Sequence, residues 1–234
     1  MSIKLGVQVG PLSVEGRKRP RNEDYVAFHE PGDPRELARS GRLYIVADGV
    51  GGAAHGERAS QYAAQKVLYD FYQSSGPDLG ERLQSAIRAA NADLYQYAER
   101  ADAPQPIGTT LVAAVLCGPE LVVANVGDSR AYLIREGRIH QISRDHSLVQ
   151  KLIDEEELTP EAALTFPRKN VILRSVGAEA FVDVDVFRCE ARPGDTLLLC
   201  TDGLHKYFPD PTEIAHVAGE IGRASCRERV YVLV

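Results

Sequence analysis

The sequence of 234 residues contains no tryptophan, a single methionine and no apolar stretch long enough to cross a bilayer. Its longest apolar run, TLVAAVLCG at positions 110–118, is less than half of the ~20 residues that a membrane-spanning helix needs. The amino-terminal MSIKLGVQVG also lacks the apolar core of a secretory signal peptide. These absences argue against a membrane or secreted protein and predict a cytoplasmic one that makes no membrane contact.

Cysteines are few and positive charge is not in excess. No two of the four cysteines are spaced as in CxxC or zinc motifs, so we expect reduced, mostly buried thiols. The net charge of -6 argues against a nucleic-acid-binding protein, although GRKRPR at 16–21 is a local basic cluster. With 44% hydrophobic and 26% charged residues, the chain has the composition of an ordinary globular domain.

Strands and helices are predicted in blocks and do not alternate singly. Apolar stripes at helical spacing predict two long consecutive helices over 56–73 and 78–100, and two short ones within 146–166. Thr159-Pro160 has the form of a helix start, with a capping residue before proline. Short apolar strands separated by Gly- and Pro-containing turns lie before and after the long helices. This order predicts an α+β fold with antiparallel sheets covered by helices.

Several acidic residues stand at the predicted ends of apolar strands. Two buried strands, YIVADG and LLLCTDG, end on Asp-Gly, and RNEDYV and ANVGDSRAY place further acids at strand edges. Carboxylates crowded at the rim of a core need cations, and oxygen donors without His or Cys suit Mg²⁺ or Mn²⁺. These acids are Glu23, Asp24, Asp48, Asp128 and Asp202.

Each of these signals has an ordinary alternative when taken alone. Asp-Gly is a common turn dipeptide, and the glycines after Asp48 could simply join a strand to a helix. A phosphate loop of the P-loop type is disfavoured because no GK[ST] follows those glycines. His55 is predicted to be a loop histidine, His146 a capping or packing residue, and Arg19 and Arg21 solvated charges.

Taken together and in order, these stretches resemble the metal-dependent Ser/Thr protein phosphatases, the PPM or type 2C family, in its bacterial branch. The matching stretches are RKRPRNEDYVAF, YIVADGVGGAAHGERAS, GTTLVAAVL, VANVGDSRAYLIREGRIHQISRDHSLVQKLI, PRKNVILRSVG and PGDTLLLCTDGL. The resemblance implies a four-layer α-β-β-α sandwich, in which two antiparallel sheets are flanked by helices. It also implies a centre of two Mn²⁺ or Mg²⁺ ions, with a possible third, weaker site.

The resemblance assigns metal ligands by position. Asp48 would bridge the two ions, Gly49 would offer its backbone carbonyl to one of them, and Asp202 would bind the other. Asp128 matches the aspartate that serves the third, weaker ion in bacterial members.

The resemblance also assigns residues around the ions. Glu23 and Asp24 would hold metal-bound waters, and Arg19 corresponds to the arginine that grips the substrate phosphate, a task that suits a planar bidentate donor. Some family members carry a histidine directly after the first Asp-Gly as a candidate acid for the leaving group. Here that position is Val50, so the resemblance names no general acid.

The implied activity is hydrolysis of phosphoserine or phosphothreonine on proteins by a water that two metal ions activate. The implied partners are phosphorylated proteins, namely a Ser/Thr kinase and its substrates, and the chain is expected to be a monomer. Two alternatives stay open: a catalytically impaired pseudophosphatase that binds phosphoproteins, and a metal-dependent nucleotide or sugar-phosphate hydrolase. The segment 146–177 corresponds to the variable flap beside the site, with acidic residues followed by Arg168 and Lys169.

The end of the chain departs from the family pattern. The family has a last metal ligand in an Asp-Asn pair, and no Asp-Asn follows Asp202. The segment EIGRASCRERV resembles the translation of a sequencing-library adapter. The sequence therefore predicts an incomplete phosphatase domain at 1–219 and a non-native segment at 220–234, and hence a fragment that could be inactive.

Overall fold

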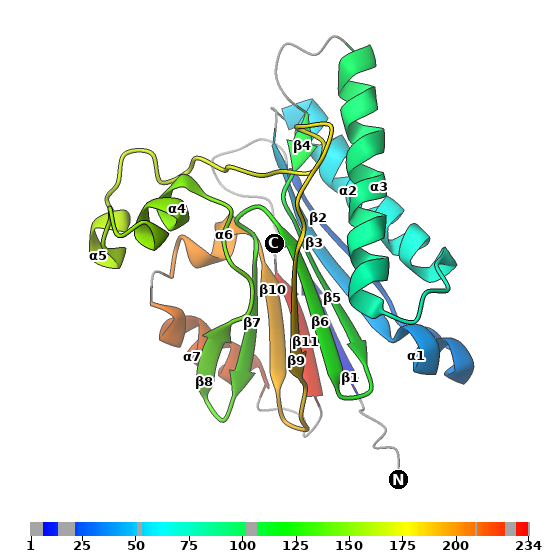
Figure 1. Ribbon diagram of the computed structural model, residues 1–234. Coiled ribbons are helices and arrows are strands. Elements are labelled where there is room, and N and C mark those ends of the chain that lie inside the picture. Colours follow the sequence, from blue (N-terminus) through cyan, green and yellow to red (C-terminus); the bar gives the residue numbers. More distant parts are fainter. Residues whose placement is uncertain are drawn as a thin grey trace.

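The structure is a computed structural model that describes residues 7–13, 22–50, 53–101, 107–208, 210–222 and 228–233. Two sheets form its centre (Figure 1). The five-stranded sheet has the order β1 (Val7–Leu12), β11 (Glu228–Leu233), β10 (Thr196–Cys200), β7 (Arg130–Arg135) and β8 (Arg138–Gln141). The six-stranded sheet has the order β2 (Asp24–His29), β3 (Arg42–Val50), β5 (Leu111–Cys117), β6 (Glu120–Val126) and β9 (Asp185–Glu190), with β4 (Gly108–Thr109) paired to β3.

Strand pairing is antiparallel throughout the six-stranded sheet and in the β10–β7 and β7–β8 ladders. Strand β11 is different, because it lies parallel to both β1 and β10. It comes from the segment that the sequence marks as non-native, and helix α7 (Pro211–Gly222) runs across the expected boundary at residue 219. That boundary stays a prediction.

Helices cover the outer face of each sheet. Figure 1 shows α2 (Ala53–Gln73) and α3 (Leu79–Arg100) together on one side of the sheets, and α6 (Asp202–His205) and α7 on the other. The order of layers is therefore helices, sheet, sheet, helices, which confirms the predicted α+β sandwich. No helix in the described ranges is both long and apolar enough to traverse a bilayer.

In strand β3 successive side chains point to opposite faces of the sheet and so contribute to two different hydrophobic cores. Its side chains Leu43, Ile45 and Ala47 pack under α2 and α3, while Tyr44 and Val46 point into the layer between the sheets. All five are fully buried, so the nearly continuous apolar run has both faces covered, as the sequence predicts. A third cluster packs Tyr132, Ile134, Leu198 and Cys200 against Ile214, Ala215 and Ala218 of α7.

Local capping accounts for several helix starts. The Asp78 side chain accepts a hydrogen bond from the Glu81 backbone N–H at the start of α3, and Thr159 caps α5 (Pro160–Ala163) with Pro at its first turn, as predicted. Ser147 caps α4 (Leu148–Asp154). Helix α1 (Pro34–Ser40) was not predicted, although Asp33 and Pro34 form the same start signal.

Several predicted strands differ from the structure at their ends. Strand β3 does not stop at Asp48 but continues to Val50, because Gly49 and Val50 pair with β4. The alternating segment 181–191 contributes only Asp185–Glu190 as a strand, over the length that pairs with β6.

Candidate metal centre

Two of the predicted acids face each other directly. In the β2–β3 ladder Asp24 is the cross-strand partner of Asp48. Like charges at directly opposed positions of a sheet destabilise it. A cross-strand carboxylate pair at this place in the sheet therefore needs a proton or a cation.

The other acids come from the other side of the sandwich. The sequence predicts a strand that ends on Asp202, but β10 ends two residues earlier at Cys200, and Asp202 instead begins the short helix α6. The buried Thr201 hydroxyl donates to Asp24 Oδ2 at 3.3 Å and so links β2 to the end of β10. Asp128 lies in the turn between β6 and β7, the connection from one sheet to the other.

Burial and mutual repulsion raise the pKa of two of these carboxylates, Asp48 and Asp128. Burial, followed by the charges of Asp24, Asp202 and Asp128, raises the pKa of Asp48 well above its usual range. Burial and the nearby Asp202 raise the pKa of Asp128 to about 6. The structure thus brings together Asp24, Asp48, Asp128 and Asp202, which lie far apart in the sequence.

One cation already lies within this group. Lys206, the C-cap residue of α6 one turn after Asp202, forms an ion pair with Asp202, and its Nζ is 4.0 Å from Asp128 Oδ2. The Asp128 side chain is only 4% exposed, so this ammonium group is close to a buried carboxylate. No sequence motif marks Lys206, because its position depends on the turn of helix that follows Asp202.

Backbone hydrogen bonds fix Asp48 from the neighbouring strands. Its N–H donates to Thr110 Oγ1 at 3.1 Å, and its carbonyl accepts from the Thr110 N–H and from the Thr109 hydroxyl, each at 2.8 Å. The Thr110 hydroxyl also contacts the Ser129 hydroxyl at 2.7 Å, next to Asp128. The GTT stretch thus supports two acids at once, a role that only the folded chain reveals.

At Gly49 the backbone of β3 lies directly against the backbone of α2. A Cβ built on Gly49 would lie 2.1 Å from the Gly56 carbonyl oxygen, so any side chain there is excluded by the backbone of the helix. The Gly49 N–H donates to the Glu23 carbonyl at 3.0 Å, and that carbonyl also accepts from the Ser60 hydroxyl at 2.6 Å. Close packing alone therefore requires a glycine at this position, whether or not its carbonyl binds a ligand. Since α2 begins at Ala53, His55 is helical and the prediction that it lies in a loop was wrong.

A buried layer beneath Asp128 holds its turn in place. His205 Nε2 donates to the Asp128 backbone carbonyl at 3.0 Å, and burial lowers the pKa of His205 to about 4. Arg130 makes a bidentate ion pair with the buried Asp145, with Nη2 at 2.7 Å from Oδ2. No sequence motif marks the contacts of His205, Arg130 or Asp145, because each contact joins separate segments of the chain.

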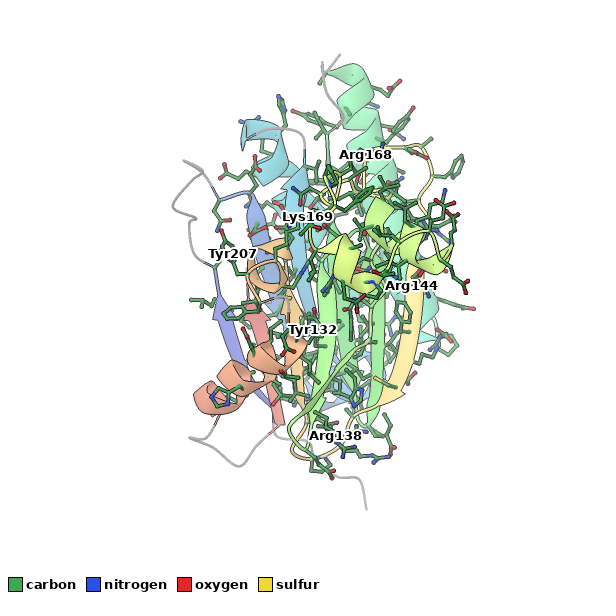
Figure 2. All side chains as sticks on the ribbon, turned by 90° about the vertical axis from the view of Figure 1, so that its left-hand side faces the viewer. Tyr132, Arg138, Arg144, Arg168, Lys169 and Tyr207 are labelled. Carbon is green, nitrogen blue, oxygen red and sulfur yellow. The ribbon has the colours of Figure 1, made fainter. Side chains whose placement is uncertain are left out.

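The predicted flap starts at a buried histidine. His146 Nδ1 accepts from the Gly127 N–H at 3.1 Å, and Nε2 lies 3.2 Å from Asp185 Oδ2. His146 is thus a packing residue, one of its two predicted roles, while Ser147 is the cap. Figure 2 shows Arg168 and Lys169 of the flap in the upper part of the molecule with Tyr207 to their left, whereas Arg138 lies at the lower end.

The residues present fit a hard divalent cation. Among the described residues, Asp128 Oδ1 is one of four buried side-chain atoms without a hydrogen-bond partner. The donors are carboxylate and carbonyl oxygens, which suit Mg²⁺ and Mn²⁺. Within the described ranges, no three His, Cys, Asp or Glu side chains are arranged closely enough to hold an ion as they stand. Arg19, the predicted phosphate ligand, lies outside the described residues.

Comparisons with known proteins bear on the whole fold. A family model described as protein phosphatase 2C matches residues 21–229. The serine/threonine phosphatase stp of Listeria innocua is 38% identical over 200 residues, which span 83% of this chain and 77% of that protein. The crystal structure of the serine/threonine phosphatase PstP/Ppp of Mycobacterium tuberculosis superposes with a TM-score of 0.75 at 36% identity, over 88% of this chain and 82% of that one.

A further solved structure contains metal. It is the catalytic domain of the serine/threonine protein phosphatase PstP in complex with two manganese ions. It is similar to this chain with a TM-score of 0.72 and 35% identity, over 89% of this chain and 82% of that one.

Proposed function

This chain belongs to the protein phosphatase 2C family, and on that premise we propose that it hydrolyses phosphoserine and phosphothreonine on proteins with bound Mn²⁺ or Mg²⁺. The observation that carries the proposal is the cross-strand pair of Asp24 and Asp48, joined by Asp128 and Asp202 from the other side of the sandwich. The charges of Asp24, Asp128 and Asp202 all raise the pKa of Asp48, so the cluster favours a divalent cation as its counter-charge.

Within this proposal each residue has a role. Asp48 would serve both ions of the centre, the Gly49 carbonyl one of them and Asp202 the other, and Asp128 would serve a third, weaker ion. When bound, such ions acidify a water and neutralise charge on the phosphoryl group.

The surrounding residues have supporting roles. Glu23 and Asp24 accept hydrogen bonds from the waters at the centre and so orient them. Arg19 binds the phosphate through two parallel N–H donors. Thr109 and Thr110 hold the Asp48 backbone, so that its carboxylate keeps one position.

Partners and location follow from the same proposal. We infer that phosphorylated proteins are the substrates, among them a Ser/Thr kinase and its targets, and that the chain acts as a monomer in the cytoplasm. Among the described residues, Cys117, Cys189 and Cys200 are free thiols, which supports a reducing compartment.

A phosphate-release assay tests the proposal. Purified protein is titrated with Mn²⁺, and release is measured from p-nitrophenyl phosphate and from a phosphothreonine peptide. We expect Asp48→Asn to lose at least about a hundredfold in rate, since even the outer partners of metal ligands are worth ~10–100-fold. The control is Asp93→Asn on α3, which removes an exposed carboxylate that accepts a hydrogen bond from Tyr62 and should keep the activity.

The outcomes separate the candidate functions. Mn²⁺-dependent release that Asp48→Asn abolishes supports the phosphatase. Release that is unaffected by Asp48→Asn refutes the assignment of the centre. A protein that binds the phosphopeptide but releases no phosphate at any Mn²⁺ concentration is a pseudophosphatase. An unchanged KM in Arg19→Ala contradicts the role of Arg19 in binding the substrate.

A further inference from the structure

Lys206 occupies an unusual place for a lysine. Its ammonium group pairs with Asp202 and lies 4.0 Å from Asp128 Oδ2, so it sits between two carboxylates that the proposed function assigns to metal ions. Lys206 can reach both because α6 begins at Asp202 and the i,i+4 spacing places the lysine one turn later on the same face.

A second lysine in the chain also lies near an i,i+4 aspartate and a more distant one, but its helical partner follows it in the sequence and its more distant partner is not buried. Lys66 on α2 pairs with Asp70 at i,i+4, and its Nζ is 3.9 Å from Asp93 Oδ2. The second carboxylate there is 44% exposed, whereas that of Asp128 is 4% exposed. An ion pair in water contributes little, but the same charges next to a buried group interact strongly. Lys66 is therefore an internal control for the position of Lys206.

From this geometry we propose that Lys206 is a tethered counter-cation for Asp128 and Asp202, which holds them together without metal and competes with the ion that they would bind. The inference rests on the proposed function, because it needs a metal at this centre. Asp128 Oδ1 is buried without a hydrogen-bond partner while Oδ2 faces Lys206, so the lysine neutralises only part of the negative charge at this site. The remaining oxygen is open to a stronger cation.

Two consequences follow from a fixed positive charge in this position. An ion at Asp128 and Asp202 must displace the ammonium group or bind beside it, so its affinity is lower than the carboxylates alone would provide. In the metal-free protein the same charge reduces repulsion among the acids, so it stabilises the fold. Removal of the charge should therefore strengthen metal binding and weaken the metal-free fold together.

Mn²⁺ titration of the full chain tests both consequences. Binding is followed by calorimetry and by the EPR signal of free Mn²⁺, and thermal unfolding is recorded with EDTA and with Mn²⁺. The variants are Lys206→Met, Lys206→Gln and the charge-retaining Lys206→Arg, with Lys66→Met as the matched control. A unit charge at ~4 Å changes an ion's affinity at least about fivefold even in water, and more at a buried site.

We expect the weakest Mn²⁺ site to bind at least about fivefold more tightly in Lys206→Met and Lys206→Gln, while Lys206→Arg and Lys66→Met bind as the wild type does. The first two variants should also unfold at a lower temperature than the wild type in EDTA, and Mn²⁺ should raise their Tm by more. A neutral variant that folds only with Mn²⁺ shows the same two effects in stronger form.

Other results overturn the proposal. If the wild type binds Mn²⁺ and the neutral variants bind it equally or more weakly, Lys206 is no competitor, and the proposed function stands. If neither the wild type nor any variant binds Mn²⁺, both the inference and the proposed function fail. Binding by the neutral variants alone supports the inference and shows that Lys206 blocks the site.

Discussion

Replacement of Gly49 by alanine tests how closely helix α2 lies against strand β3 beside the proposed metal centre. A Cβ at this position would be 2.1 Å from the carbonyl oxygen and 2.3 Å from the carbonyl carbon of Gly56. Real Cβ contacts essentially never fall below 3.0 Å, so the two backbones would have to separate by roughly 1 Å. Both groups are backbone, so no side-chain rotation relieves the clash.

The expected cost follows from what must move. Gly49 is held by its N–H bond to Glu23 and its pairing with Thr109, and the next turn of α2 packs Ala59 and Ala63 into the core. A helix that shifts over this core loses packing along its length. Overpacking typically costs ~1–3 kcal/mol of folding free energy. We expect the cost of Gly49→Ala to be at or above the upper end of this range. For a domain of this size that lowers Tm by at least about 6 °C.

The measurement uses a second glycine as its control. Gly203 also follows an aspartate of the site, but a Cβ there meets only the Thr201 hydroxyl, at 3.3 Å. Thermal and urea unfolding of the wild type, Gly49→Ala and Gly203→Ala are compared in EDTA, so that metal affinity does not enter. We expect Gly203→Ala to unfold within ~1 kcal/mol of the wild type. Equal stability of the two variants would refute the packing argument.

Two further predictions concern the buried layer beneath Asp128. Burial lowers the pKa of His205 to about 4. Between pH ~6.5 and ~4 the unfolded chain therefore binds a proton that the folded chain does not, so the free energy of unfolding decreases as the pH is lowered. We expect this loss to reach about 3 kcal/mol in metal-free protein and to be absent in His205→Gln. Urea unfolding of both proteins at several pH values measures it, and parallel stability profiles of the wild type and the variant would contradict it. Asp145→Asn leaves Arg130 without its counter-charge and should lower the free energy of unfolding by about 2–4 kcal/mol. The cost is moderate because the Arg130 side chain is 25% exposed and water can partly solvate it. Arg130→Met in the same chain should restore part of the loss, and a purely additive double variant would show that the pair is not coupled.

The layered fold could be predicted because its signals are local. Apolar stripes at helical spacing, the doubly covered run of β3 and the start signal at Thr159-Pro160 depend on neighbours in the chain. The ends of elements were harder to predict. Strand β3 continues past Asp48 because β4 pairs with Gly49 and Val50, and that partner lies about 60 residues away in the sequence.

The site was predicted only in part. The Asp-Gly pairs marked Asp48 and Asp202, but nothing in their flanking residues showed that Asp24 faces Asp48 across two strands. The supporting contacts of Thr110, His205 and Asp145 escaped the sequence analysis because each joins residues that are distant in the chain.

The sequence by itself determined which residues could bind cations and which stretches must be buried, because charge and hydrophobicity belong to single side chains and short periods. The tertiary structure decided which of these residues meet. It set the Asp24–Asp48 repulsion, the burial of Asp128 and the place of Lys206 among the acids. Distance and burial set the strength of an electrostatic interaction, and both exist only once strands and helices from distant parts of the chain have packed together.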